Sequence, residues 1–82
     1  MFYYVYLLES EGLHGVKHHY VGRTRDIRAR LARHNAGEVP HTAKFRPWRL
    51  KTAVAFDDES RATAFELYLK SSSGRAFAKK HF

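Results

Sequence analysis

The pattern of apolar residues predicts two strands at the start of the chain. Residues 2–8 consist only of Phe, Tyr, Val and Leu, without Gly or Pro, which is typical of a central strand with two apolar faces. Residues 17–22, Lys-His-His-Tyr-Val-Gly, are consistent with a second strand, and residues 9–15 between them hold two glycines and indicate a turn. We therefore expect an antiparallel hairpin, with Gly22 at a tight turn or where backbone approaches a ligand.

A helical pattern follows the hairpin. Asp26 fits the N-cap of a helix over residues 27–36, and Gly37 fits its C-terminal stop. At about 100° per residue, Ile27 and Leu31 define the buried stripe of this helix. The helix is therefore expected to pack on the sheet through these two residues.

Arg30 and His34 lie beside that stripe, on the side toward the sheet. Their i, i+4 spacing places them next to each other on the helix surface. An arginine at the rim of a buried face needs an anionic partner, which either the protein or a ligand can supply.

The second half of the chain predicts one more strand and two more helices. Pro40 and Pro47 indicate a loop over residues 38–49 rather than a helix or a central strand. A strand over 50–56, a helix from 59 to 69 or 70 capped by an aspartate, a Ser-Gly break and a short helix over 75–82 complete the order. The expected fold is a single α+β domain over residues 1–82, a three-stranded antiparallel sheet flanked by helices in the order β-β-α-β-α-α.

The charge of the chain indicates a polyanionic partner. Its 82 residues support one small core and carry a formal net charge of +7. The usual partner of such a domain is nucleic acid, and the alternative is a basic surface kept for solubility. The basic helix has too few large apolar residues for a membrane surface. Without cysteines, a signal peptide or a membrane span, we expect a cytoplasmic protein.

The loop over 38–49 alternates basic and aromatic residues, and two interpretations are open. Lys44, Phe45, Arg46 and Trp48 would suit contacts with phosphates and stacking on bases. Alternatively, Phe45 and Trp48 pack inward and anchor a long loop.

Glu66 is the sharpest single signal for chemistry. It lies inside the apolar stripe that Ala62, Phe65 and Leu69 form on the second helix, where a carboxylate is costly unless it is paired or binds a metal. One interpretation is an ion pair with an arginine such as Arg30, or a side chain that reaches solvent at the edge of the stripe. The other is a carboxylate that holds Mg²⁺ together with waters.

Tyr6 and Tyr20 are expected close to each other in the hairpin. Tyrosines in strands usually serve packing, and one can act as a general base only if cations lower its pKa of about 10. Arg30, His34 and a metal on Glu66 would supply such cations.

These residues fall into a known pattern. Tyr4-Val5-Tyr6 and Tyr20-Val21-Gly22 resemble the two halves of the GIY-YIG motif. The correspondence continues through Arg30, eight residues after the glycine, to His34 and then to Glu66 on a late helix. Over essentially its whole length the chain resembles the small stand-alone GIY-YIG domain proteins of bacteria. The resemblance implies a metal-dependent phosphodiesterase.

The resemblance also implies a role for each of the five residues. Glu66 would bind one divalent cation, Mg²⁺ or Mn²⁺, and Arg30 would stabilise charge on the phosphate. Tyr6 and Tyr20 would orient and deprotonate the attacking water, with Tyr6 as the base. His34 would hydrogen-bond to the site and tune it.

The chain departs from the family pattern at two positions. Tyr4 stands where the motif has its first glycine, and no asparagine follows Glu66. Lys70, Ser72 or Ser73 are candidates to replace that asparagine. A recognition domain of the kind that nuclease relatives carry is not expected here, which predicts little sequence specificity.

The sequence thus predicts a metal-dependent DNA endonuclease or nickase in DNA repair or processing. A nucleic-acid-binding repair accessory module without catalysis is the alternative. DNA rather than RNA rests on the resemblance. The residues expected to bind nucleic acid are Arg23, Arg25, Arg28, Arg33, Lys44, Arg46 and Lys70.

Overall fold

A three-stranded antiparallel sheet forms the centre of the computed structural model, which describes residues 1–12 and 15–82. Strands β1 (Tyr3–Glu11), β2 (Lys17–Thr24) and β3 (Arg49–Phe56) are arranged in the order β2-β1-β3. The helices are α1 (Ile27–Asn35), α2 (Pro40–Ala43), α3 (Glu59–Lys70) and α4 (Ser72–His81). The predicted fold class is confirmed. None of the described helices is long and apolar enough to cross a membrane.

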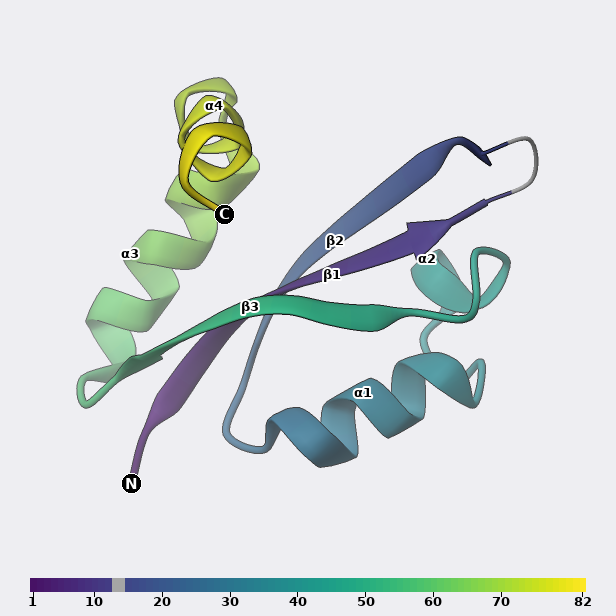
Figure 1. The fold of residues 1–82 in the computed structure, drawn as a ribbon. Coiled ribbons are helices and arrows are strands. Elements are labelled where there is room, and N and C mark those ends of the chain that lie inside the picture. The colour runs from purple at the N-terminus through teal and green to yellow at the C-terminus, as the bar shows by residue number, and fades with distance from the viewer. Residues whose placement is uncertain (13–14) are drawn as a thin grey trace.

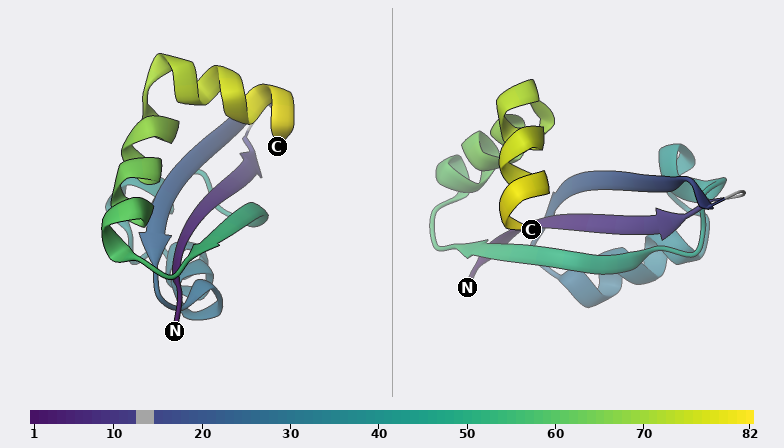
Figure 2. Two further views of the ribbon diagram at one scale, coloured as in Figure 1. Left: turned by 90° about the vertical axis from the view of Figure 1, so that its left-hand side faces the viewer. Right: turned by 45° about the horizontal axis from the view of Figure 1, so that its top comes forward.

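The helices cover the two faces of the sheet separately. Figure 1 shows α1 and α2 on one side of the sheet and α3 and α4 on the other, and Figure 2 shows the same separation from two further angles. The central strand β1 supplies both cores, because its successive side chains point to opposite faces. Val5 packs with Ala62 of α3 on one face, whereas Tyr6 and Leu8 pack with Trp48 on the other.

The predicted hairpin is confirmed, but Gly22 lies inside β2 rather than at a turn. The strand continues to Thr24, and Gly22 is the antiparallel partner of Tyr6. Positive φ angles occur at Gly15 and Gly37. The turn expected over residues 9–15 is shorter, since β1 extends to Glu11, and its residues 13–14 lie outside the described part of the chain.

The signals predicted at both ends of α1 are confirmed. The Asp26 carboxylate accepts a hydrogen bond of 3.0 Å from the Ala29 backbone N–H, so it satisfies one free donor at the helix start. Gly37 has a φ of 79° just after the helix end, a conformation that glycine adopts without strain. Ile27 and Leu31 pack on the core around Tyr6 as predicted.

The sequence predicts a loop over 38–49, but part of this segment is helical. Residues 40–43 form α2, and Pro40 stands at its first position, where the missing N–H is not needed. Trp48 is buried and donates from Nε1 to the Thr42 carbonyl at 2.8 Å, while Phe45 stacks on His18. Both aromatic side chains therefore pack against the protein, in agreement with the anchoring interpretation.

Helix α4 begins three residues earlier than predicted. Ser71 caps it by accepting a hydrogen bond of 3.1 Å from the Gly74 N–H, so only Ser71 breaks the preceding helix. Gly74 lies directly against the end of α3, where a Cβ would overlap the Tyr68 carbonyl. Asp58 caps α3, which spans Glu59–Lys70 as predicted.

Candidate active site

A chain of hydrogen bonds links β1 to α1 and α2. The hydroxyl of the buried Tyr6 lies 3.0 Å from Nε2 of His34, which is fully buried. Nε of Arg30 donates to the same hydroxyl at 3.3 Å. On the other side of the imidazole, Nδ1 lies 2.8 Å from the Thr42 hydroxyl, which donates to the Val39 carbonyl at 3.3 Å. Arg30 and His34 thus both face the sheet, as their spacing predicted.

The Val39 carbonyl at the end of this series of hydrogen bonds determines which group donates in the bonds of Thr42, His34 and Tyr6. A carbonyl only accepts, so Thr42 uses its proton there and must accept from Nδ1–H of His34. A neutral imidazole with its proton on Nδ1 accepts at Nε2. Tyr6 therefore donates its proton to His34, while the Tyr6 oxygen accepts from Arg30.

The electrostatics of the site support this assignment. Burial lowers the pKa of His34, and the charges of Arg30 and Arg33 lower it further, so the imidazole is neutral. Burial raises the pKa of Tyr6 by more than the hydrogen bond from Arg30 lowers it. Arg30 lowers the Tyr6 pKa as expected, but burial outweighs it and the net pKa is raised. His34 is a proton acceptor here rather than a cation.

Gly22 gives the Tyr6 hydroxyl its place over β2. A Cβ at Gly22 would overlap both the Tyr6 hydroxyl and the adjacent ring carbon. Tyr20 lies next to this point, with its ring centroid 6.3 Å from that of Tyr6 and 4.9 Å from that of His34. The two tyrosines are therefore neighbours, as expected. Gly22 allows the close approach of the Tyr6 side chain and does not form a turn.

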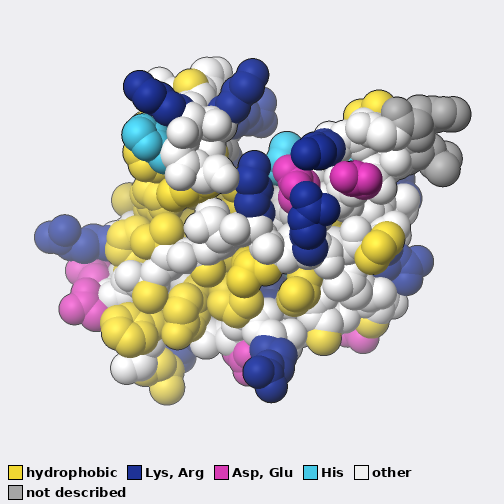
Figure 3. Space-filling view, viewed as in Figure 1, with side chains coloured by type: hydrophobic (Ala, Val, Ile, Leu, Met, Phe, Trp, Pro, Cys, Tyr) yellow, Lys and Arg dark blue, Asp and Glu magenta, His cyan; other side chains and the backbone are white. Residues whose placement is uncertain are grey.

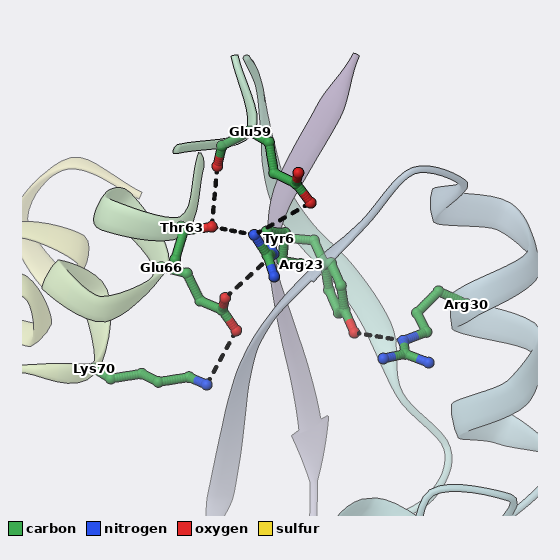
Figure 4. Close-up of polar contacts among 7 residues, drawn as sticks. All are labelled: Tyr6, Arg23, Arg30, Glu59, Thr63, Glu66 and Lys70. Carbon is green, nitrogen blue, oxygen red and sulfur yellow. Dashed lines mark hydrogen bonds and ion pairs between the residues drawn. The ribbon is translucent and has the colours of Figure 1, made fainter. Parts of the chain in front are cut away.

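Glu66 reaches the same region from α3, on the other side of the sheet. Figure 4 shows Tyr6 between Glu66 on one side and Arg30 on the other. The Glu66 side chain is 18% exposed and pairs with Arg23 at 3.7 Å and with Lys70 at 3.1 Å. The ion-pair interpretation is thus correct in kind, but the partners are Arg23 and Lys70 rather than Arg30.

The donor set around Glu66 fits one weakly held divalent cation. In the described part of the chain, no three His, Cys, Asp or Glu side chains gather into a metal-binding group. A single carboxylate with waters is an ordinary site for Mg²⁺. The cation would have to compete with the Lys70 ammonium for Glu66.

Arg23 is held in place by several contacts with α3, unlike a freely exposed surface arginine. Its guanidinium donates to Thr63 and lies 3.9 Å from Glu59, in addition to its pair with Glu66 (Figure 4). Arg23 therefore joins β2 to α3 and has most of its charge matched.

The other predicted nucleic-acid contacts are more exposed, and several have local partners. Arg25 lies over the Tyr3 ring, and Arg28 is exposed on α1. Arg33 pairs with Glu38 at 3.5 Å. Lys44 lies over the Phe45 ring, and Arg46 donates to the Ala43 carbonyl at 2.6 Å. These residues extend from just before α1 to the segment after α2, whereas Lys70 lies at the end of α3 and pairs with Glu66.

Two features of the surroundings were missed by sequence reasoning. Thr42 gave no signal, because its segment was expected to be a loop. Glu9 is a buried carboxylate on β1 that pairs with His19 at 2.9 Å, with Lys51 at 3.6 Å and with Arg49. The hydrogen bond from His19 lowers the pKa of Glu9, and the charges of the nearby cations add to this. The break in hydrophobicity at Glu9 was the available signal.

Comparisons with known proteins identify a family and two similar proteins. Residues 2–80 match the GIY-YIG catalytic domain family. The chain is 38% identical over 72 residues to a UPF0213 protein of Cupriavidus pinatubonensis, a match that covers 87% of this chain and 76% of that protein. The solution NMR structure of a UPF0213 protein from Bacillus halodurans is similar, with a TM-score of 0.52 and 31% identity over 96% of this chain and 81% of the other.

Proposed function

The chain belongs to the GIY-YIG catalytic domain family, and we propose that it is a divalent-metal-dependent DNA endonuclease or nickase with little sequence specificity. Membership places it in a nuclease family whose members generally use a divalent metal and bind nucleic acid. We further propose that it works in DNA repair or processing in the cytoplasm.

The observation that carries this proposal is the directed hydrogen-bond chain from Arg30 through Tyr6 to His34. Tyr6 takes a proton from the attacking water while it passes its own proton to Nε2 of His34. The water oxygen forms the new bond to phosphorus, the bond to the leaving oxygen of the strand breaks, and that oxygen takes a proton from solvent water. Because the imidazole accepts the proton, Tyr6 acts as a base without remaining a buried phenolate.

The remaining residues would bind and orient the phosphate. Arg30 presents its guanidinium beside the Tyr6 hydroxyl, where negative charge grows in the transition state. Tyr20 would orient the water from the neighbouring strand position. Glu66 would hold the divalent cation, which, when bound, supplies Lewis-acid stabilisation of the phosphate oxygens.

A binding module without catalysis is the second candidate, and one observation favours it. Glu66 is already paired with Lys70 and Arg23, and these cations oppose the entry of a metal ion. A protein that keeps this pairing would bind nucleic acid without cutting it.

A plasmid nicking assay separates the two candidates. We expect the wild type to nick supercoiled DNA with Mg²⁺ or Mn²⁺, and Glu66→Ala and Arg30→Ala to lose at least about a hundredfold in rate. Arg61→Ala removes the same charge as Arg30→Ala from a side chain that is 79% exposed, and should nick normally. Equal nicking by all variants would refute the assigned site. Salt-dependent binding without any nicking would establish the accessory function.

A further inference from the structure

A groove of about 600 Å³ lies between the sheet and α4, on the face opposite α1. Its apolar floor is lined by Leu7, Val21, Leu69 and Ala78, and Tyr20 of β2 also borders it. Cationic side chains and one histidine stand around this floor: His19, Lys51, Lys70, Arg75 and Lys79. Figure 3 shows Lys and Arg side chains on both sides of the hollow between α4 and the sheet.

The cationic side chains on the two walls of the groove differ in whether they form ion pairs. On the sheet side, His19 and Lys51 pair with Glu9. On the helix side, Arg75 and Lys79 are spaced i, i+4 along α4 and make no ion pair with any residue of 1–12 or 15–82. The wall formed by α4 therefore carries two unmatched positive charges above an apolar surface.

We propose that this groove binds an unpaired stretch of the nucleic acid strand, with a base on the apolar floor and phosphates on Arg75 and Lys79. Apolar surface bordered by cations is the combination that binds single strands, where bases offer free faces. Bases inside a duplex are stacked and present only their edges. The volume is that of a small-molecule pocket rather than of a duplex channel.

The groove is continuous with the candidate active site, because Tyr20 and Lys70 both line it. Lys70 lines the groove and pairs with Glu66 at 3.1 Å. A phosphate in the groove competes with Glu66 for the Lys70 ammonium and so frees the carboxylate for a divalent cation. This part of the inference rests on the proposed function, and it makes an unpaired strand near the cut the preferred substrate.

Binding of a fluorescent ten-nucleotide oligo(dT) in EDTA tests the groove without any cleavage. We expect Arg75→Ala/Lys79→Ala to bind about tenfold more weakly than the wild type. The slope of log affinity against log salt should fall by about 1.4, since each phosphate contact on a single strand contributes about 0.7. Arg61→Ala/Lys80→Ala removes the same charge from exposed positions outside the groove and should change affinity less than threefold. An equal loss in both double variants would overturn the proposal.

NMR mapping with the same oligonucleotide locates the bound strand directly. Oligo(dT) should shift the amide signals of Leu7, Val21, Leu69 and Ala78, whereas inorganic phosphate should leave the floor unchanged. Shifts confined to α1 and α2 would refute the groove while leaving the nuclease proposal intact. Groove binding by a wild type that nicks no plasmid would support the groove and refute the nuclease proposal alone.

Discussion

The Tyr6 hydroxyl donates its proton to Nε2 of His34 at 3.0 Å. Gly22 leaves open the space that the hydroxyl occupies. The Thr42 hydroxyl fixes the imidazole tautomer by accepting a hydrogen bond from Nδ1–H of His34. The geometry couples a buried phenol with a raised pKa to a neutral imidazole, which is suited to proton transfer.

Tyr6→Phe should strongly reduce nicking and also destabilise the protein. The ring remains, but Nε2 of His34 loses its buried partner, which costs about 1–3 kcal/mol. We expect nicking to fall about 10²–10⁴-fold. Tyr20→Phe is the matched control for stability: it should reduce nicking with little change in the free energy of unfolding. Urea denaturation and plasmid nicking provide the two measurements, and wild-type nicking by Tyr6→Phe would exclude it as the base.

Thr42→Val should disturb the site through His34 without touching substrate. The Nδ1–H would lose its acceptor, at a cost of about 1–3 kcal/mol. The alternative tautomer would then be favoured, and its Nε2–H cannot accept from Tyr6. Nitrogen-15 NMR of the imidazole should show the proton on Nδ1 in the wild type and a shift toward Nε2 in the variant. Thr42→Ser should restore both the tautomer and nicking. An unchanged spectrum would show that Thr42 does not position the ring.

Gly22→Ala should displace the Tyr6 side chain. The added methyl group overlaps the hydroxyl, so we expect a loss of about 1–3 kcal/mol in stability from overpacking and a loss of nicking. Ala53→Ser, at the exposed β3 neighbour of Tyr6, should change stability by less than about 0.5 kcal/mol. A Gly22→Ala protein with wild-type stability would contradict the close approach.

Stability should fall as pH is lowered through the range just below 6.5. His34 has its pKa lowered from the usual 6.5 by burial, so the unfolded chain binds the proton more readily than the folded one. The free energy of unfolding therefore rises with pH between the folded and unfolded pKa values of His34. Urea denaturation from pH 5 to 7.5 should show this slope in the wild type and a flatter one in His34→Gln. Identical slopes would refute a buried neutral imidazole.

A second loss of stability is expected at lower pH and should be common to both proteins. Glu9 and Asp58 have lowered pKa values, so their contributions are present above their unfolded pKa values and are lost as pH falls through the folded ones. This window lies below about 4.5, apart from that of His34.

Lys70→Met should tighten metal binding at Glu66. It removes the ammonium that competes for the carboxylate at 3.1 Å, an exposed pair of about 1 kcal/mol or less. Mn²⁺ affinity should then rise by up to about fivefold, as measured by electron paramagnetic resonance. Lys80→Met removes the same charge from an exposed position that does not line the groove and should have little effect. Glu66→Gln should abolish binding in either background, and an unchanged affinity in Lys70→Met would show that Lys70 does not compete.

Much of the scaffold was predictable because its signals are local. The apolar run over 2–8 identified a central strand, Asp26 and Gly37 marked the helix ends, and Arg30 and His34 were placed on the sheet side by spacing alone. Periodicity and capping depend on residues a few positions apart. They are therefore readable before the chain is folded.

The tertiary structure decided which groups meet. Gly22 leaves space for the Tyr6 hydroxyl because the two residues are cross-strand partners. Thr42 contacts His34 because it lies in the short helix α2, in a segment that the sequence predicted to be a loop. The partners of Glu66 and the basic groove beside α4 depend on how α3 and α4 pack on the sheet. Contacts between elements distant in sequence leave no local pattern, so the sequence determined the candidate residues and packing determined their hydrogen bonds and charge partners.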